Sequence, residues 1–382
     1  MGLRQGLGGA VFATALGALV ALVVALGGDG SEAAAQSGQP APNIVVIQTD
    51  DQTVEMMRVM ERTNAAIAAE GATFVRHFTN YPLCCPSRAT LLTGQYAHNH
   101  GVLGNSPPRG GYTNFPRRDN LAVWLKAVGY RVGHVGKFLN GYGDDQLAET
   151  PYDDVREVPP GWTEWRTAKG RSTYLHYRFT QNYWDDSGDP SQPREGELIK
   201  FGEAEEDHKT DVNSGEATAL IEGYATASEP FYLQVDYVAP HGGGPRVGYP
   251  HPPQDCSRSA KAAPRHADAL NGVANAVAQD PSYNERDVSD KPRSIRALPR
   301  VTAKAAEQIR QRYECQLESL LTVDEGVDAI IAALRESGEL ANTYVFFTSD
   351  NGFFHGEHRI QGGKGRVYEL SLIHISEPTR PY

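Results

Sequence analysis

Four short apolar runs, each followed directly by polar side chains, limit the folds open to this chain more than any other feature. They lie at 44–47, 130–135, 231–235 and 344–347. Helical patterns separate them, at 57–70, 121–128, 216–227 and 302–336. Because strands alternate with helices, the sequence predicts an α/β fold with a mainly parallel central sheet and helices on both of its faces.

The polar side chains after these runs are expected to meet, because ligands bind where the carboxyl ends of parallel strands gather. The side chains concerned are Asp50, Asp51, Lys137, Asp236, His241, Asp350 and Asn351. Adjacent carboxylates repel each other unless a cation lies between them. Three carboxylates and an amide carbonyl suit a hard metal ion, Ca²⁺ before Mg²⁺, although each pair alone could be an ordinary turn.

Residues 84–94 read Cys-Cys-Pro-Ser-Arg-Ala-Thr-Leu-Leu-Thr-Gly. Pro86 fits the first turn of a helix, where its missing N–H costs nothing. Cys84 would then lie beside a helix N-terminus, where free N–H groups and the helix dipole favour an anion. Arg88, one turn further, could bind oxygens of such an anion. Without more context, the two cysteines could also be buried small residues or disulfide partners.

This segment resembles the signature of the type I sulfatases, Cys-x-Pro-Ser-Arg followed by Thr-Gly. The resemblance implies an alkaline-phosphatase-like sulfatase fold, with 43–369 as a truncated catalytic domain that lacks the C-terminal subdomain. It also implies that a formylglycine-generating enzyme converts Cys84 to formylglycine, whose gem-diol attacks a sulfate ester. The implied ligands of Ca²⁺, or of Mg²⁺ as the alternative, are Asp50, Asp51, Asp350, Asn351 and residue 84.

Three further positions match residues that contact sulfate in this family. They are Lys137 in a Gly-Lys pair, His241 in Ala-Pro-His, and Lys364 near the end of the match. His241 would bind sulfate or protonate the leaving oxygen, and the two lysines would neutralise sulfate charge. With Cys84 and Arg88 they form the implied catalytic set. The simpler interpretation is a solvated charge for each lysine and a loop residue for the histidine.

One position departs from many arylsulfatases, which have a histidine, assigned to deprotonating the diol, where this chain has Leu139. The motifs at 83–88, 98–100 and 136–140 resemble the N-acetylglucosamine-6-sulfatase branch instead. This resemblance implies a substrate with 6-sulfate on glucosamine units of a glycosaminoglycan. Asn140 could take over contacts of the missing histidine. The candidate substrate contacts His98, Asn99 and His100 could equally be turn residues.

Two other functions stay open at this point. Some relatives with the same modified cysteine hydrolyse phosphonate or phosphate esters. The chain could also be an inactive, glycan-binding fragment, since residues 370–382 resemble a translated sequencing adapter and not natural sequence. We therefore expect the natural protein to continue differently after Glu369.

The N-terminus predicts export. Arg4 precedes an apolar run from 8 to 28, and three alanines at 33–35 suit signal cleavage, so we expect a signal peptide over 1–35 and a linker over 36–42. The product would be secreted, or lie in the cell envelope or periplasm, without a stable membrane span. An uncleaved anchor is the alternative.

The formal net charge of -11 gives no support to a nucleic-acid partner. A sulfated polysaccharide would need a local basic cleft for the same reason. Residues 150–300 are irregular and rich in Pro, Gly and charge, which is typical of loops that recognise substrate. In an exported protein Cys256 and Cys315 could form a disulfide, or they could be two free thiols.

Overall fold

The computed structural model describes residues 41–143, 157–169, 173–174, 178–182, 194–243, 256 and 259–366. The predicted signal peptide at 1–35 and the tail at 370–382 lie outside the described residues. The fold belongs to the unit that begins at Asn43. Within the described residues, no helix is both long and apolar enough to cross a membrane.

A seven-stranded sheet with the order β7-β5-β4-β2-β8-β1-β9 forms the centre of this unit. The strands are β1 (Asn43–Thr49), β2 (Arg131–Lys137), β4 (Glu164–Lys169), β5 (Arg178–Asn182), β7 (Glu197–Lys200), β8 (Phe231–Asp236) and β9 (Thr343–Ser349). The five strands from β4 to β9 in this order are parallel, whereas β5 and β7 add two antiparallel pairings at one edge. The predicted mainly parallel sheet is therefore confirmed.

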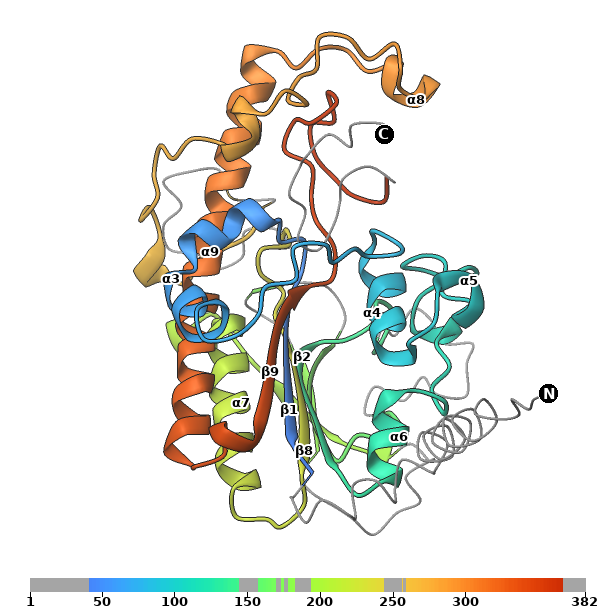
Figure 1. The fold of residues 1–382 in the computed structure, drawn as a ribbon, viewed down its shortest axis with the longest axis vertical. Coiled ribbons are helices and arrows are strands. Elements are labelled where there is room, and N and C mark those ends of the chain that lie inside the picture. Colours follow the sequence, from blue (N-terminus) through green and yellow to red (C-terminus); the bar gives the residue numbers. More distant parts are fainter. Residues whose placement is uncertain are drawn as a thin grey trace, which may run out of the picture. The chain divides into compact units, whose positions relative to one another are not determined.

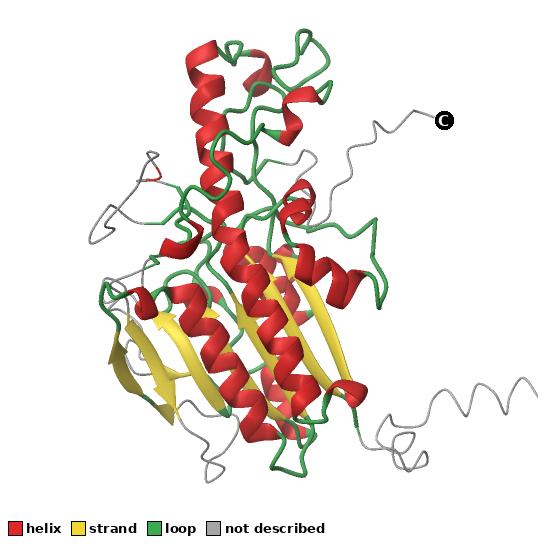
Figure 2. Cartoon of the chain, turned by 90° about the vertical axis from the view of Figure 1, so that its left-hand side faces the viewer, coloured by secondary structure: helices red, strands yellow, loops and turns green. Residues whose placement is uncertain are grey.

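Helices cover both faces of the sheet, as expected. The helices α7 (Lys209–Tyr224) and α9 (Ala303–Glu336) pack on one face against Val45, Leu233 and their neighbours. The helices α4 (Cys84–Thr93) and α6 (Leu121–Ala127) pack on the other face, where the core includes Val46 and Val132. Figure 1 shows the two layers on either side of the sheet, and Figure 2 shows α7 and α9 lying across it.

Several shorter elements connect this frame. They are η1 (Val54–Val59), α3 (Glu61–Thr63), η2 (Asn64–Ala68), α5 (Ala97–His100), η3 (Tyr112–Asn114), β3 (Glu157–Val158), β6 (Arg194–Glu195), η5 (Glu205–Asp207), η7 (Pro264–His266), η8 (Ala276–Gln279), α8 (Arg293–Arg296) and η9 (Leu340–Asn342). Strands β3 and β6 form a separate antiparallel pair.

The two helices α6 and α9 follow the predicted bounds closely because local side chains cap them. The Asn120 side chain accepts the N–H of Ala122 at the start of α6, and Thr302 accepts that of Ala305 at the start of α9. Helix α7 begins seven residues before the predicted position 216. These caps and the buried apolar stripe of α9 explain why its 34 residues were predictable.

The predicted helix at 57–70 is wrong as a single element. It is a series of three short pieces, η1, α3 and η2, interrupted at Met60. A distant side chain explains the break: Asp324 of α9 accepts the backbone N–H groups of Arg62 and Thr63, at 3.0 and 2.8 Å. A new helix start is thus capped from another part of the chain.

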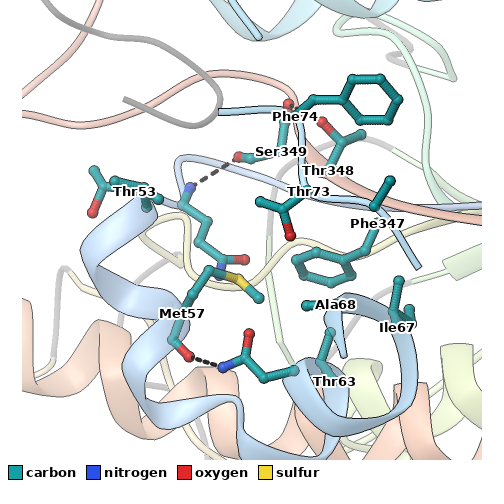
Figure 3. A pocket seen from close by; sticks show the side chains of 14 residues that line it. Thr53, Met57, Thr63, Ile67, Ala68, Thr73, Phe74, Phe347, Thr348 and Ser349 are labelled. Atoms are coloured by element: carbon teal, nitrogen blue, oxygen red, sulfur yellow. Dashed lines mark hydrogen bonds between the residues drawn. The ribbon is translucent and has the colours of Figure 1, made fainter. Parts of the chain in front are cut away.

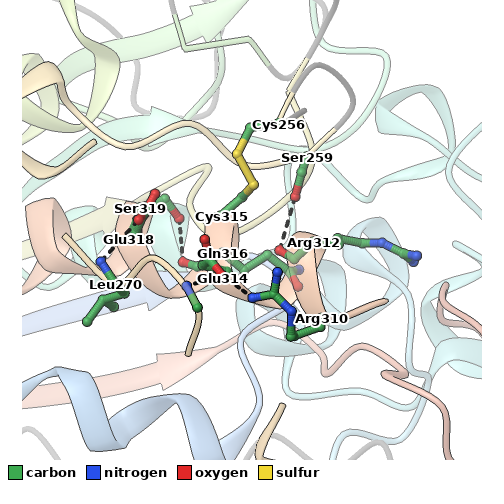
Figure 4. The surroundings of a disulfide bond; sticks show 11 residues. Cys256, Ser259, Leu270, Arg310, Arg312, Glu314, Cys315, Gln316, Glu318 and Ser319 are labelled. Carbon is green, nitrogen blue, oxygen red and sulfur yellow. Dashed lines mark hydrogen bonds and ion pairs between the residues drawn. A yellow bond between two sulfur atoms is a disulfide. The ribbon is translucent and has the colours of Figure 1, made fainter. Parts of the chain in front are cut away.

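Cys256 and Cys315 form a disulfide, which settles the alternative left open by the sequence. Cys315 lies on α9, so the bond joins that helix to the segment that follows His241 (Figure 4). Close by, the Ser259 hydroxyl donates to the carbonyl oxygen of Arg312, and the N–H of Gly243 donates to the carbonyl of Ser259. The stretch after His241 is therefore tied back to α9 at its far end.

Candidate active site

The polar ends of the central strands meet at one edge of the sheet. Asp50 follows β1, Lys137 ends β2, Asp236 ends β8 and Asp350 follows β9. Lys137 donates to Oδ2 of Asp50, and Asp350 accepts the N–H of Asp51 at 3.3 Å. All four side chains are buried. The parallel arrangement has the consequence expected from the sequence, since groups distant along the chain share one site.

Cys84 is the first residue of α4, and Pro86 lies in the first turn of that helix. The Cys84 thiol donates to Oδ1 of Asp50 at 3.3 Å, and Nζ of Lys364 lies 2.6 Å from its sulfur. Burial, followed by the charge of Asp50, raises the pKa of the Cys84 thiol. Cys85 instead packs in the apolar core on the sheet face that α4 and α6 cover. The two adjacent cysteines therefore occupy different environments, and only Cys84 belongs to the charged site.

Asp50, Asp51, Asp350 and Cys84 could share a cation, because one ligand atom from each lies within 4.8 Å of the others. The Asn351 amide donates to Oδ1 of Asp51 at 2.6 Å. Its own Oδ1 is buried and has no hydrogen-bond partner among the described residues. A buried amide oxygen without a donor is costly unless a ligand satisfies it. Four oxygen-bearing side chains in this arrangement fit a hard cation such as Ca²⁺.

The two carboxyl groups at the centre of the site have opposite pKa shifts. Burial disfavours ionisation of Asp50, but the charge of Lys137, followed by those of His241, Lys364 and Arg88, holds its pKa well below the usual range. Burial and the neighbouring charge of Asp50 raise the pKa of Asp350. Asp51 adopts a left-handed backbone conformation with φ of 73°, which is uncommon outside glycine. The carboxylates of Asp50, Asp51 and Asp350 lie close together, and a bound cation would relieve the repulsion between their negative charges.

Arg88 is held rigidly while one of its nitrogens stays available. Its Nε donates to Oδ2 of Asp350 at 2.8 Å, and its Nη1 donates to the carbonyl oxygen of Lys137 at 3.1 Å. Nη1 also lies 3.3 Å from Oδ1 of Asp236. Nη2 is buried, has no hydrogen-bond partner among the described residues, and lies 3.8 Å from Oδ2 of Asp50. This nitrogen can donate to an anion that enters the site.

Lys137, Lys364 and His241 complete the charged site. Lys364 donates to Oδ1 of Asp51. Burial opposes the charged form of both lysines, but the carboxylates outweigh it and raise the pKa of each. Nε2 of His241 lies 3.9 Å from Oδ2 of Asp51, and the ring is 28% exposed. Nδ1 of His241 lies 2.7 Å from the carbonyl oxygen of Gly242, which leaves Nε2 directed toward the site.

The sequence placed Asp236 among the strand-end side chains expected to meet, but it assigned the residue no specific contact. Its Oδ2 lies 2.9 Å from Nε2 of His134 and accepts the Gln234 amide at 2.7 Å. Nδ1 of His134 lies 2.6 Å from the hydroxyl of Thr167. Through Asp236, these buried groups contact the Arg88 guanidinium. The contacts with His134 and Gln234 are what the sequence analysis missed, because only the strand-end position of Asp236 is visible in the sequence.

The remaining candidates lie in other places. Asn140 follows β2, and its Oδ1 is buried without a hydrogen-bond partner among the described residues. His98 and Asn99 are exposed, and the ring of His98 stacks on Tyr96. His100 is buried and lies 3.1 Å from the hydroxyl of Thr90. These three residues belong to α5, which packs against α4. Described contacts do not join them to the charged site.

A separate pocket of about 210 Å³ lies between η1, η2 and the end of β9. Met57, Ile67 and Phe347 line it, and no lining residue is ionisable (Figure 3). The N–H of Gln52 donates to the hydroxyl of Ser349 at its edge, at 3.1 Å. The pocket is therefore mainly apolar, with hydroxyl and amide side chains in its lining, and it offers no charged acid or base.

Comparison with known proteins places this site in context. The model of one protein family, Sulfatase, matches residues 42–375. An arylsulfatase of Volvox carteri is 32% identical over 353 residues, which cover 88% of this chain and 50% of that protein. The N-acetylglucosamine-6-sulfatase of Homo sapiens is 27% identical over 359 residues, which cover 92% of this chain and 58% of that protein. The chain thus spans about half the length of these relatives.

Among solved structures, that of BT4656 in complex with its substrate D-glucosamine-2-N,6-O-disulfate is similar, with a TM-score of 0.59. The two chains share 20% sequence identity, and the match covers 87% of this chain and 69% of the other. At that identity the likeness establishes the fold.

Proposed function

This chain belongs to the sulfatase family, and from that premise we propose that it hydrolyses sulfate monoesters with residue 84 as the nucleophile. The observation that carries the proposal is the position of Cys84. Its sulfur lies 3.3 Å from Asp50 and 2.6 Å from Lys364, at the N-terminus of α4 and inside a buried set of carboxylates and cations. A helix N-terminus with adjacent cations suits an anionic substrate.

The proposed nucleophile is the hydrated aldehyde that a formylglycine-generating enzyme makes from Cys84. A gem-diol has two hydroxyls on one carbon, and a sulfatase can use both. The first attacks sulfur, and the bond from sulfur to the alcohol oxygen breaks. The second then loses its proton, the carbonyl re-forms, and sulfate leaves. Water restores the diol. A serine or cysteine has no second hydroxyl for the release step.

Each charged side chain has a place in this scheme. Arg88, Lys137 and Lys364 bind and neutralise the sulfate oxygens, and Nη2 of Arg88 is a donor without a hydrogen-bond partner in the described part of the chain. His241 gives a proton to the leaving alcohol oxygen, since it is the most exposed of the charged residues around Cys84 and so faces the substrate's entry. Leu139 is buried among apolar residues and carries no basic group, so it takes no part in proton transfer.

Asp50, Asp51, Asp350 and Asn351 would hold a divalent cation, Ca²⁺ in preference to Mg²⁺. The fit rests on the carboxylate cluster and on the buried oxygen of Asn351 that lacks a donor. Such a cation would offset negative charge and lower the pKa of a hydroxyl close to it. The chain itself contributes the fixed position of Asp50 between Cys84 and Lys137.

The proposed substrate is a sulfated sugar, with 6-sulfate on glucosamine units of a glycosaminoglycan as the specific choice. Support comes from the 27% identity to the human N-acetylglucosamine-6-sulfatase. The motif at 136–140, with Leu139 and Asn140, points the same way. We further propose that the protein is exported, on the evidence of the N-terminal apolar run, and that it matures in a compartment where the Cys84-converting enzyme is available.

Two matched variants test the proposal. The chain is expressed with a formylglycine-generating enzyme, and hydrolysis of an aryl sulfate is compared for Cys84→Ala and Cys85→Ala. Both residues are buried and adjacent, but only Cys84 contacts the charged site. We expect Cys84→Ala to abolish turnover and Cys85→Ala to retain it within about threefold. Tryptic mass spectrometry should find residue 84 as the aldehyde. Full activity with an intact thiol at residue 84 would disprove the mechanism.

A further inference from the structure

Residues 291–304 are strongly basic in a chain whose formal net charge is -11. They contain five cations and no carboxylate. Lys291 pairs with Asp290 at 2.6 Å and with Glu285 at 3.4 Å. The other four are Arg293, Arg296, Arg300 and Lys304, which we call the basic surface. All four are exposed, and no described carboxylate forms an ion pair with them.

Cations without ion pairs on a surface are usually only solvated. The backbone that carries these four is held in place by packing, which distinguishes them from ordinary surface charges. Arg293 and Arg296 are the first and last residues of α8, and Ile295 between them is buried. Ile295 packs with Val288, Phe354 and Ile360 in a small apolar cluster. The basic surface is therefore anchored to the segment that follows β9.

Arg359 strengthens this attachment. Its guanidinium donates three hydrogen bonds to backbone carbonyl oxygens on either side of α8, those of Glu285, Arg286 and Leu298, at 2.9 to 3.1 Å. Backbone bonds add to it, since the N–H of Asn284 donates to the carbonyl oxygen of Gly356 at 2.8 Å. Residue 359 adopts φ of 68°, an uncommon conformation that packing must hold in place.

The segment that holds the basic surface also builds the charged site. Asp350 and Asn351 begin it, and Lys364 lies near its end. Figure 1 shows α8 beyond the end of the sheet toward which β9 points. Asp350 directly follows that end of β9. Arg296 and Arg300 donate only to backbone carbonyl oxygens among the described residues, those of Ser289 and Asn284, so their charge is not neutralised by an ion pair. The fold thus connects four cations without a described ion pair to the charged site through one well-anchored segment.

We propose that the basic surface binds sulfated polysaccharide chains outside the pocket that holds the ester being cut. The inference rests on the proposed function and specifies its substrate as a polymer. A polysaccharide with sulfate on many units carries repeated anions, and guanidinium groups bind such oxygens in pairs. Screening limits the field of the net negative charge to about 8–10 Å in physiological salt, so a local positive surface can still attract a polyanion.

The test compares two variants of the full chain that lose the same charge. One carries Arg293→Gln, Arg296→Gln, Arg300→Gln and Lys304→Gln. The matched control removes four other exposed cations, with the substitutions Arg76→Gln, Arg109→Gln, Lys200→Gln and Arg335→Gln. Binding to heparan sulfate chains is measured at several salt concentrations, and circular dichroism verifies that both variants are folded.

We expect the basic-surface variant to bind heparan sulfate roughly tenfold more weakly than the native chain. Its dependence of log Kd on log salt should also flatten by roughly one unit per lost cation, as it does for proteins on polyanionic nucleic acids. The control should change less than about threefold. Equal losses in both variants would overturn the proposal, and so would tighter binding of the native chain to a DNA duplex of equal length.

Binding needs no turnover, so this test is distinct from that of the proposed function. A basic-surface variant that loses heparan sulfate binding supports the polymer site even if the native chain releases no sulfate from an aryl ester. Conversely, a native chain that cleaves aryl sulfate while both variants bind the polymer equally keeps the hydrolase and refutes the basic surface. In active protein, the basic-surface variant should lower the ratio of polymer to aryl sulfate turnover by roughly tenfold.

Discussion

His134 and Asp236 form a fully buried pair, with Nε2 of the histidine 2.9 Å from Oδ2 of the carboxylate. Burial lowers the pKa of His134, although its hydrogen bond to Asp236 opposes the shift. The ring is therefore neutral near pH 7. Its Nε2–H donates to Asp236 and its Nδ1 accepts from Thr167, which is the one tautomer that satisfies both contacts. Oδ1 of Asp236 remains free to face Arg88.

Asp236→Asn should weaken catalysis without unfolding the protein. The amide keeps the size of the carboxylate but removes the charge 3.3 Å from Nη1 of Arg88, so the guanidinium is held less firmly. Groups that orient a site in this way are typically worth about 10–100-fold in activity. We expect kcat/KM on an aryl sulfate to fall within that range. Tyr232→Phe removes a hydroxyl that donates to Gln234 and to no other group among the residues that the structure describes, so it is the control and should cost less than about threefold.

Thermal unfolding of Asp236→Asn distinguishes a loss of Arg88 orientation from a general loss of stability. If Asp236→Asn lost activity only in proportion to a lower unfolding midpoint, Asp236 would be a structural residue. Retained stability with lost kcat would assign it to the orientation of Arg88.

Calcium should stabilise the metal-free chain. The carboxylates of Asp50, Asp51 and Asp350 repel one another in the folded protein, and a bound cation relieves this. At a concentration of about 100 times Kd, a ligand specific for the folded state adds about 2.7 kcal/mol to the free energy of unfolding. We expect the unfolding midpoint to rise by several degrees when CaCl₂ is added after EDTA treatment, with a smaller rise for MgCl₂.

Asp350→Asn should remove most of this calcium effect. Asp328→Asn alters an exposed carboxylate paired with Arg62 and should keep the effect intact. Equal midpoints with and without calcium in the native chain would exclude a specific site at these carboxylates.

The disulfide should contribute strongly to stability. It closes a loop with a sequence separation of 59 residues, and for a loop of that length the chain-entropy model gives about 4 kcal/mol. The double variant Cys256→Ser, Cys315→Ser should therefore unfold at a clearly lower urea concentration. Dithiothreitol should lower the midpoint of the native chain and leave that of the double variant unchanged. An effect of dithiothreitol on both would point to some other thiol or disulfide.

Part of this structure follows from local sequence. Continuous apolar runs identified the central strands, and strand direction then brought Asp50, Lys137 and Asp350 to one edge. The first turn at Pro86 likewise indicated where α4 begins, whereas the choice of Cys84 over Cys85 came from the resemblance to the sulfatase signature. These features depend on side-chain patterns within about ten residues, which a sequence displays directly.

Other features depend on contacts between distant residues. The break at Met60 follows from Asp324, which is 261 positions from Thr63. The pair of His134 and Asp236 joins residues 102 positions apart. Strands β5 and β7 lack long apolar runs, so their pairing at the sheet edge could not be recognised from periodicity. No local pattern records such contacts, and the sequence alone did not reveal them.

Asp211 should make stability depend on acid pH. Burial disfavours its charge, but Nδ1 of His208, 3.5 Å from its Oδ2, and the hydrogen bonds from Arg265 lower its pKa to about 2 from the usual 3.8. A folded-state pKa below the unfolded value stabilises the protein above about pH 4, and this contribution is lost as pH falls from 4 toward 2. Because the Asp211 side chain is 30% exposed and its partner Arg265 is 37% exposed, solvent screening reduces the contribution to about 1 kcal/mol.

Urea unfolding of Asp211→Asn tests this sign. The variant should be less stable than the native chain at pH 7, and the difference should shrink toward zero near pH 2. Asp328→Asn, at a more exposed ion pair, should differ by only a few tenths of a kcal/mol at either pH. A deficit for Asp211→Asn that is the same at both pH values would show that lost packing, and not charge, is responsible.

Gly136→Ala should disrupt the site through the backbone. Gly136 precedes Lys137 in β2 and has φ of 103°, and a Cβ there would lie 2.0 Å from the carbonyl oxygen of Asp236. Strands β2 and β8 would have to separate, which would displace both Lys137 on β2 and Asp236 on β8 from the site. We expect a loss of about 3 kcal/mol or more in the free energy of unfolding and nearly complete loss of aryl sulfate turnover. The matched control is Gly129→Ala, since Gly129 has φ of 92° but open space around its Cβ position. That variant bears the backbone strain alone, about 1 kcal/mol, so comparable losses in the two variants would show that the close approach to β8 is unimportant.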